Sequence, residues 1–337
     1  SKDLPLGFVD RQEKELLVRD FIISNIKEVM IKYGFQYLET PSFEFSDSIG
    51  KFLPDKERPD EGVFSFKDEN KWLSLRYDLT APLARYVAKN YLEIPKPFKR
   101  YQLGTVWRNE KPGPGRFREF LQFDADFVGT KSLQADAELC VMISEILEKC
   151  GLSKEEYTVK ISSRKITEEL FKKINIKRSY AAVAQLVRAL VCGTRGRWFE
   201  PTLLYQKMTK DKKNKPSKEL PLGFVDRQEK ELLVRDFIIS NIKEVMIKYG
   251  FQYLETPRFE YSDSIGKFLP DKERPDEGVF SFKDETKWMS LRYDLTAPLA
   301  RYVAKNYLEI PKPFKRYQLG TVWRNEKPGP GRFREFL

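Results

Sequence analysis

Hydrophobic and polar residues alternate along two stretches of the chain, at 101–108 and 120–127. The odd positions of the second stretch are all apolar: Leu121, Phe123, Ala125 and Phe127. A period of two is typical of a strand with one buried face. The residues between the stretches, 109–118, contain two Pro-Gly pairs, which exclude regular structure. The pattern therefore predicts two strands joined by an irregular loop, with the even positions on a shared polar face.

Apolar residues at helical spacing indicate helices elsewhere. A stripe between 11 and 33 predicts an amphipathic helix that is capped by Asp10 and ended by Gly34. The stripe consists of Leu16, Leu17, Phe21, Ile22, Ile26, Val29 and Met30. Strands are predicted at 35–39, 63–68, 73–78 and 157–162, and helices at 79–91, 132–150 and 166–173. The predicted elements are therefore a mixture of helices and strands.

The chain contains a long internal repeat. Residues 217–337 repeat residues 1–121 at a constant offset of 216, with five differences in 121 positions. The differing pairs are Asp3/Glu219, Ser42/Arg258, Phe45/Tyr261, Asn70/Thr286 and Leu73/Met289. A period this long, repeated once, is unlike that of a solenoid. It predicts a tandem domain fragment: copy one at 1–178, an atypical basic segment at 179–216, and copy two, truncated, at 217–337.

Copy two ends at Leu337, the counterpart of Leu121. Its predicted first strand, 317–324, therefore has almost no returning strand to pair with. Burying a large apolar side chain contributes roughly 1.5–3 kcal/mol, and copy two has no counterparts of Phe123, Ala125 and Phe127. We expect copy two to be the less stable copy.

Composition narrows the class of protein. Hydrophobic residues make up 41% of the chain and charged residues 33%, which predicts a folded, soluble protein. No stretch approaches about 20 uninterrupted apolar residues, and the first residues lack the apolar run of a secretory signal. Three scattered cysteines indicate a reducing cytoplasm. The chain has no histidine, which excludes catalysis by a histidine side chain and removes the usual zinc ligands, so we expect no protein metal site.

The segment 179–216 carries much of the net charge of +11, with eight Lys or Arg against two Asp or Glu. Such a run is usual for a solvated linker, while 181–192 predicts a short apolar helix. Basic residues beside Trp198 and Phe199 would also suit RNA. A third interpretation is a translated DNA insertion, because Trp198 to Pro201 can be encoded by a self-complementary string that resembles the T-arm of a tRNA gene.

The polar face of the predicted strand pair carries side chains that could bind a ligand. Arg108, Arg116 and Arg118 lie on it or in its loop, and guanidinium groups bind phosphate with two parallel hydrogen bonds. Nearby carboxylate and amide groups suit a polar organic substrate; they are Glu110, Gln122, Asp124 and Asp126. The alternative is a charged hairpin in which the arginines and acids pair with each other.

Three motifs in this region carry a resemblance. They are Val-Trp-Arg-Asn-Glu at 106–110, Gly-Arg-Phe-Arg-Glu-Phe at 115–120 and Gln-Phe-Asp-Ala-Asp at 122–126. Together they resemble motif 2 of class II aminoacyl-tRNA synthetases, and in detail that of histidyl-tRNA synthetases. The resemblance implies an α+β fold, a mostly antiparallel sheet with flanking helices. The Gly-Phe-x-x-Leu-x-x-Pro pattern at 34–41 resembles motif 1, which forms the dimer interface in this family. An ordinary amphipathic helix packed on its own sheet is the alternative for this helix and strand.

The resemblance implies a nucleotide site in the motif 2 hairpin. Arg108 is the implied catalytic residue, which holds the α-phosphate of ATP and the amino-acid carboxylate. Phe120 stacks on adenine, and Glu110 and Arg116 lie around the nucleotide. The reaction that the resemblance implies is ATP-dependent activation of histidine, with Mg²⁺ bound by ATP, followed by transfer to tRNA.

The resemblance also implies an amino-acid site. Gln122 and Asp126 face the amine and imidazole of the substrate. The segment Leu-Arg-Tyr-Asp-Leu-Thr at 75–80 resembles the segment that receives the amino acid, with Asp78, Leu79 and Thr80 at the substrate. Asp78 as the cap of the following helix is the alternative. The counterparts in copy two are Asp294, Thr296, Arg324, Glu326, Arg332 and Phe336.

The resemblance ends near residue 176, and nothing resembles motif 3 or the anticodon-binding domain. We therefore expect activity to be impaired or absent. A homodimer, or an intrachain pair of the two copies, is expected through motif 1. The same residues leave open an amino-acid-sensing regulatory paralogue of histidine biosynthesis, which needs no nucleotide-binding arginines, and a non-functional product of a disrupted gene.

Overall fold

A computed structural model describes residues 2–49, 62–68, 71–161, 217–265, 278–284 and 287–337. The chain forms two compact units, Ser1–Cys150 with Asn214–Leu337, and Gly151–Lys213. All helices and strands below belong to the first unit. None of the described helices is long and apolar enough to cross a membrane. The domain boundaries expected at 178 and 216, and the helices expected at 166–173 and 181–192, lie outside the described residues.

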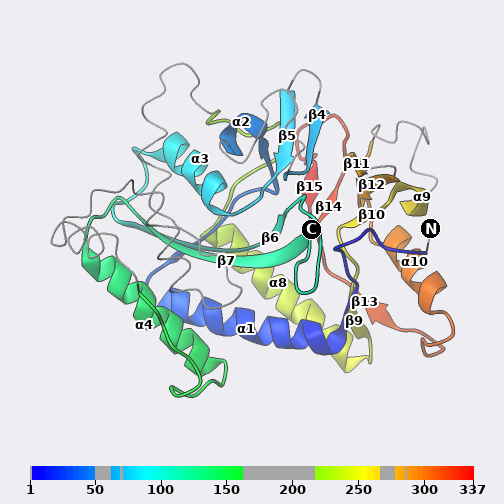
Figure 1. Ribbon diagram of the computed structural model, residues 1–337, viewed down its shortest axis with the longest axis horizontal. Helices are drawn as coiled ribbons and strands as arrows, with labels where there is room; N and C mark the ends of the chain where they lie inside the picture. Colours follow the sequence, from blue (N-terminus) through cyan, green and yellow to red (C-terminus); the bar gives the residue numbers. More distant parts are fainter. Residues whose placement is uncertain (1, 50–61, 69–70, 162–216, 266–277, 285–286) are drawn as a thin grey trace, which may run out of the picture. The chain divides into compact units, whose positions relative to one another are not determined.

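The first long element of copy one is a helix, and most of its strands follow that helix (Figure 1). Its elements are β1 Arg11–Gln12, α1 Glu13–Lys32, β2 Gln36–Glu39, β3 Phe43–Phe45, α2 Ser46–Ile49, β4 Ser65–Asp68, β5 Lys71–Leu75, α3 Thr80–Asn90, β6 Phe98–Trp107, β7 Glu119–Val128 and α4 Leu133–Lys149. Strands β6 and β7 pair antiparallel along ten residues each. The predicted strand pair is confirmed, and the mixture of helices and mostly antiparallel sheets fits the expected fold class.

The register of β6 and β7 separates a polar face from an apolar one. Arg100 lies opposite Asp126 and Gln102 opposite Asp124, so these even positions share one face. On the other face the odd positions pack against α1 and α4, which lie beside each other below the strand pair in Figure 1. The apolar cluster there contains Ile26, Val29, Met30, Tyr101, Leu103, Met142 and Ile146. This packing fixes which side of the hairpin is free for a ligand.

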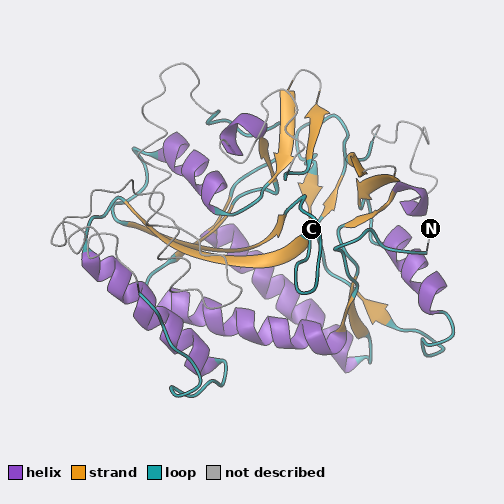
Figure 2. Cartoon of the chain, in the orientation of Figure 1, coloured by secondary structure: helices purple, strands orange, loops and turns teal. Residues whose placement is uncertain are grey.

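Copy two repeats these elements as far as its sequence allows. They are β8 Arg227–Gln228, α8 Glu229–Lys248, β9 Gln252–Glu255, β10 Phe259–Tyr261, α9 Ser262–Ile265, β11 Ser281–Asp284, β12 Lys287–Leu291, α10 Thr296–Asn306, β13 Arg316–Tyr317, β14 Val322–Trp323 and β15 Glu335–Phe336. The single strand expected at 317–324 is wrong: β13 and β14 have two residues each. Figure 2 shows that these strands are much shorter than β6 and β7 of copy one. In the described part of copy two, β14 pairs antiparallel with β15.

The two copies pack against each other by reciprocal contacts. Strand β1 pairs with β9 of copy two, and β8 pairs with β2 of copy one, both antiparallel. The N-terminal segment of each copy therefore packs on the other copy. Leu16 lies in a cluster of copy two, and Leu232 lies in a cluster of copy one. Such reciprocity, in which the same patch is used twice, is the property of an isologous interface.

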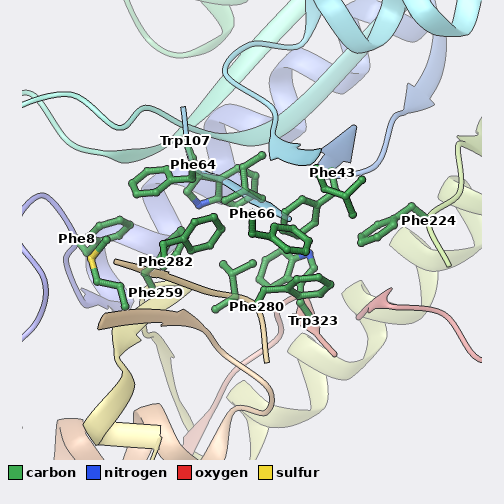
Figure 3. Close-up of a cluster of buried hydrophobic side chains, with 14 residues drawn as sticks. Phe8, Phe43, Phe64, Phe66, Trp107, Phe224, Phe259, Phe280, Phe282 and Trp323 are labelled. Carbon is green, nitrogen blue, oxygen red and sulfur yellow. The ribbon is translucent and has the colours of Figure 1, made fainter. Parts of the chain in front are cut away.

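A shared aromatic cluster lies between the copies (Figure 3). Copy one contributes Phe8, Phe43, Phe64, Phe66, Leu73, Leu75 and Trp107, and copy two contributes their seven counterparts, Phe224, Phe259, Phe280, Phe282, Met289, Leu291 and Trp323. Phe43 and Phe280 have ring centroids 4.9 Å apart, and Phe64 and Phe259 5.0 Å apart. Each copy thus contributes half of one cluster.

Ion pairs across the interface also occur twice. Arg19 contacts Glu255 at 2.9 Å and Arg235 contacts Glu39 at 2.7 Å. Each pair is followed along the helix by a lysine–aspartate pair between α1 and α8, Lys27 with Asp236 and Lys243 with Asp20. The motif 1 helices expected at 11–33 and 227–249 therefore meet through charged side chains, while each helix packs on a strand of the other copy.

Several local expectations are corrected by these contacts. Helix α1 begins after Gln12, and Asp10 is not its cap, because that carboxylate accepts a hydrogen bond from Arg301 of copy two at 2.8 Å. The strand expected at 73–78 ends at Leu75. The described part of the strand expected at 157–162, up to Ile161, is not a strand.

The apolar stripe of α1 is only partly a core face. Leu17, Phe21 and Ile22 are 46%, 53% and 40% exposed. The buried members of the stripe are Leu16, Ile26, Val29 and Met30. The helix lies with this second group toward the sheets, so helical spacing alone placed three residues on the wrong side.

Candidate functional site

The polar face of β6 and β7 is closed at one side by the segment that follows β5. This segment passes so near β6 that a Cβ at Gly104 would lie 2.6 Å from Nη2 of Arg76. Arg76 is buried and donates to the carbonyl oxygens of Thr40 and Thr105 at 2.6 and 2.8 Å. Glycine at 104 thus permits the close approach, and Arg76 fixes the segment that carries Asp78.

Three aspartates form one end of the site. Oδ1 of Asp78 accepts hydrogen bonds from the backbone N–H groups of Thr80 and Ala81 at 3.1 and 3.0 Å, so Asp78 does cap α3. Asp124 accepts from Gln122 at 2.9 Å and from the Thr80 hydroxyl at 3.3 Å. Asp126 pairs with Arg100 at 3.1 Å.

One oxygen of this group has no partner. Asp78 is 1% exposed, and its Oδ2 has no hydrogen bond to any described residue. A buried carboxylate oxygen without a donor is costly, because the desolvated charge is not compensated. The site is therefore complementary to a cation that carries N–H donors.

Burial and neighbouring carboxylates raise the pKa of two of these acids, Asp78 and Asp126. Burial raises the pKa of Asp78, and the nearby charge of Asp124 raises it further, against hydrogen bonds from Ala81 and Thr80 that lower it. Burial also raises the pKa of Asp126, with Arg100 acting against it and Asp124 and Asp78 adding to it. A bound cation would relieve this strain between like charges.

Arg108 forms the other end of the site. Its guanidinium lies 4.6 Å from the ring centroid of Tyr77 and 4.9 Å from that of Phe120. The Tyr77 hydroxyl donates to Glu110 at 2.6 Å, and Arg116 pairs with the other oxygen of Glu110. Arg108 makes no ion pair with a described residue, so this cation is held by aromatic rings and remains available to an anion.

The charged-hairpin alternative holds for part of the face. Arg116 pairs with Glu110, and Arg118 pairs with Asp284 of copy two at 2.7 Å. Arg118 is buried there and cannot serve a ligand, which corrects its expected place on the open face. Arg108 does not follow the alternative.

Sequence reasoning missed two residues of the site. A strand continuing to 78 would put Tyr77 and Asp78 on opposite faces, but the strand ends at Leu75 and the chain turns. Arg100 was not considered, although its place opposite Asp126 follows from the register, and its guanidinium also donates to the Leu79 carbonyl at 2.9 Å. Leu79 itself is fully buried, so its backbone rather than its side chain contributes.

Copy two keeps half of this arrangement. Arg324 lies 4.5 Å from the Tyr293 ring centroid and 4.9 Å from that of Phe336, and Tyr293 donates to Glu326 at 2.5 Å. Asp294 still caps its helix, accepting from Thr296 N at 3.0 Å. Thr296 and Arg332 are exposed. The given sequence of copy two reaches Leu337, one position before the counterpart of Gln122.

No metal centre is evident in the described part of the chain, where no three His, Cys, Asp or Glu side chains are arranged to hold an ion. Cys140 and Cys150 are free thiols. The site is therefore a strand-pair surface with a cation at one end and carboxylates at the other.

The helix, strand pair and motif 2 residues define a class II aminoacyl-tRNA synthetase type of catalytic domain. The model of the family described as histidyl-tRNA synthetase matches residues 7–191 and 223–337. These ranges cover most of the chain, and the chain belongs to the histidyl-tRNA synthetase family.

Similar proteins agree with this assignment. The histidine–tRNA ligase of Bartonella quintana (strain Toulouse) is 54% identical over 174 residues, which is 51% of this chain and 35% of the relative. That of Brucella ovis is 50% identical over 184 residues, 54% of this chain and 37% of the relative. The chain thus matches about a third of the length of these curated relatives.

Solved structures of the same family are also similar. The histidyl-tRNA synthetase of Nostoc sp. PCC 7120 is 29% identical, with a TM-score of 0.47, and the match covers 56% of this chain and 43% of that one. A Bacillus halodurans protein described as an ATP phosphoribosyltransferase regulatory subunit/histidyl-tRNA synthetase is 25% identical, with a TM-score of 0.40, covering 45% of this chain and 39% of that one.

Proposed function

We propose that copy one binds histidine and ATP and forms histidyl adenylate. The observation that carries the proposal is the unpartnered, buried Oδ2 of Asp78, on the same strand-pair surface as the ring-held guanidinium of Arg108. A zwitterionic amino acid with a basic side chain has the matching charges: ammonium and imidazole toward the acids, carboxylate toward the arginine.

The acidic end would select the substrate. Asp78 is assigned to the α-ammonium group, and Asp126 with Gln122 to the imidazole. Thr80 already donates its hydroxyl to Asp124, which leaves the Thr80 lone pairs free to accept from the ammonium. An amino acid without a basic side chain would leave Asp126 without a partner apart from Arg100, which costs affinity.

Arg108 would hold the two groups that react. A carboxylate oxygen of histidine attacks the α-phosphorus of ATP, the bond from that phosphorus to the bridging oxygen breaks, and pyrophosphate leaves. Arg108 neutralises the charge that gathers on the α-phosphate oxygens, and Phe120 supplies an aromatic face for adenine. Mg²⁺ enters bound to the ATP phosphates, because the described residues offer it no ligand set of their own.

This chemistry needs no side-chain nucleophile or base, so a chain without histidine can perform it. The relatives are named as ligases of histidine to tRNA, and transfer to tRNA is the further step that we assign to the same lineage, in the cytoplasm. The chain matches about a third of such relatives, and the activity we propose for it is limited to the activation step.

The pairing of copies within one chain would take the place of a homodimer. The reciprocal strand pairs and the shared aromatic cluster support this proposal. In it copy two serves mainly as the structural partner of copy one.

The experiment is histidine-dependent ATP–pyrophosphate exchange by the purified chain, with histidine binding measured by calorimetry. We expect binding to vanish on Asp126→Ala and to survive Asp294→Ala, the matched change at the counterpart of Asp78 in copy two. The change Arg108→Ala should lower the rate of exchange roughly 10²–10³-fold, which is the usual cost of removing one such electrostatic group. Histidine binding should be retained in large part.

The outcomes separate the alternatives left open by the sequence. Histidine binding without exchange would indicate the sensing paralogue. Loss of binding from both aspartate variants would contradict the assignment of the site to copy one, and absence of binding to the unchanged chain would refute the proposal.

A further inference from the structure

The amino-acid end of the site is built at the start of helix α3. Asp78 caps this helix through the backbone N–H groups of Thr80 and Ala81. The carbonyl oxygen of Leu79 accepts a hydrogen bond from Arg100 at 2.9 Å. A shift of α3 would therefore also shift Asp78 and Thr80, and the contacts that hold the helix decide how well these two side chains are positioned.

A residue of copy two holds α3. Arg85 lies on the buried side of this helix, and its side chain is 1% exposed. Both terminal nitrogens of its guanidinium donate to the carboxylate of Asp226, Nη1 at 3.0 Å. A contact with two parallel hydrogen bonds fixes orientation as well as distance. Asp226 lies just before β8, in the N-terminal segment of copy two and 141 positions from Arg85.

Arg85 also faces a carboxyl group of its own copy. Its Nε lies 2.7 Å from Oε2 of Glu44, which is fully buried. Burial raises the pKa of Glu44 to about 8, although the nearby charge of Arg85 acts to lower it. Glu44 is therefore mostly neutral at pH 7, and Asp226 is the carboxylate that balances the charge of the buried guanidinium.

The same arrangement occurs a second time, with the copies exchanged. Arg301 of α10 donates to both oxygens of Asp10, and its Nε lies 2.8 Å from Glu260. The exposed fractions in the two pairs are equal, 1% for each arginine and 14% for each aspartate. Asp10 and Asp226 are thus matched in their contacts, but Asp226 holds the helix that follows Asp78, whereas Asp10 holds α10.

We propose that Asp226 is a positioning residue for the amino-acid site of copy one, and that it acts through Arg85 and helix α3 on Asp78 and Thr80. The inference rests on the proposed binding of histidine by copy one. It gives copy two a part in that binding, because a carboxylate of copy two sets the orientation of the helix at which the α-ammonium group is received.

The test compares Asp226→Asn with the matched change Asp10→Asn in the 337-residue chain. Each variant removes one ion pair of the same geometry, so the two should lower the melting temperature by similar amounts. Calorimetry is done at a temperature at which both variants are folded. Asp226→Asn should weaken histidine binding about fivefold or more, because residues in one hydrogen-bond network are coupled, whereas Asp10→Asn should change it less than about twofold.

Kinetics distinguish positioning from a general loss of structure. In ATP–pyrophosphate exchange, Asp226→Asn should raise the KM for histidine about fivefold or more and leave the KM for ATP within about twofold, because Arg108 lies at the other end of the site. Asp226→Glu keeps the charge on a longer side chain, and its KM for histidine should lie between those of Asp226→Asn and the unchanged chain. In a chain that carries Arg85→Gln, Asp226→Asn should have no further effect, since both changes remove the same contact.

A further readout needs no ligand. Hydrogen exchange at the amides of Thr80 and Ala81 reports the opening of the α3 cap, and Asp226→Asn should speed it about fivefold. Asp10→Asn should instead speed exchange at Thr296 and Ala297, whose amides are bonded to Asp294. If the unchanged chain binds no histidine, the proposed function fails, and these exchange rates still decide whether Asp226 positions the start of α3.

Three results would overturn the proposal. One is equal weakening of histidine binding by Asp226→Asn and Asp10→Asn, or weakening by neither. Another is an equal rise in the KM values for histidine and ATP. The third is unchanged exchange at Thr80 and Ala81 in Asp226→Asn.

Discussion

The single charged difference at the interface of the copies is Arg258, which stands where copy one has Ser42. Its guanidinium pairs with Glu119 at 3.0 Å and with Glu255 at 3.5 Å, and both carboxylates are nearly buried. Glu255 also receives Arg19 at 2.9 Å. The change Arg258→Ser would give copy two the residue that copy one has, and it should remove one ion pair between the copies and one within copy two.

The expected loss of stability can be worked out from the lowered pKa of Glu255. Burial acts to raise its pKa, but the charges of Arg258 and then Arg19 outweigh this and lower the pKa from 4.5 to about 2. That lowering corresponds to about 3 kcal/mol of interaction with the ionised form. Arg19 remains after the change, and Glu119 keeps its bond from Trp107 at 3.1 Å. We therefore expect the variant to lose about 1–2 kcal/mol at neutral pH.

The assay is urea unfolding of both chains at several pH values. A carboxyl group whose pKa is lowered on folding stabilises the protein in full above its unfolded pKa, here about 4.5, and loses that effect as the pH falls toward 2. The difference between the chains should be largest at pH 7 and shrink between pH 4.5 and 3. A difference that stays constant over this range would refute the electrostatic account.

A surface pair provides the control. Arg11 and Glu15 are one turn apart, and Glu15 is 61% exposed. Breaking this pair by Glu15→Gln should cost less than about 0.5 kcal/mol, because exposed ion pairs contribute little. An equal loss from both variants would mean that burial at the interface does not matter.

Other predictions follow from the same contacts. The full chain should sediment as a monomer at all concentrations, whereas fragment 1–178 should form a dimer, because it carries one half of an isologous interface. Fragment 217–337 should be cleaved faster than 1–178 in limited proteolysis, and equal resistance would contradict the importance of β7. Phe280→Ala should destabilise the chain by about 3–5 kcal/mol in urea unfolding, while Phe237→Ala, at a position 70% exposed, should have little effect. Histidine binding should weaken as the pH falls, with a midpoint above the ordinary aspartate pKa of about 4, because burial raises the pKa of Asp126. A midpoint at or below pH 4 would contradict this.

Much of the strand pair could be predicted from sequence, because its signal is local. Alternation of apolar and polar residues fixed the two strands, their loop and their two faces, and the motif 2 residues then fell on the polar face. The cap by Asp78 was also predicted as an alternative, since a cap depends on residues two and three positions ahead. These features need only neighbours in the chain.

Two of the incorrect expectations concern contacts with residues far along the chain. Asp10 pairs with Arg301 instead of capping a helix, and Arg118 pairs with Asp284 instead of facing a ligand. Both partners lie in copy two. The spacing of residues along one element cannot report such pairs, and the exposed half of the α1 stripe was misplaced for the same reason.

Comparing the two copies shows which structural features depend on local sequence and which depend on neighbouring elements. Arg324 keeps its stack between Tyr293 and Phe336 because all three residues lie within the repeated part. Asp78 is 1% exposed with a raised pKa, while Asp294, in the same local sequence, is only half buried. The element that differs is β7, which brings Asp124 and Asp126 beside Asp78. An arginine held between two rings therefore keeps its place in both copies, whereas the burial of Asp78 depends on the strand that follows residue 118. We expect binding of an amino acid to depend on that strand more than on any residue shared by the two copies.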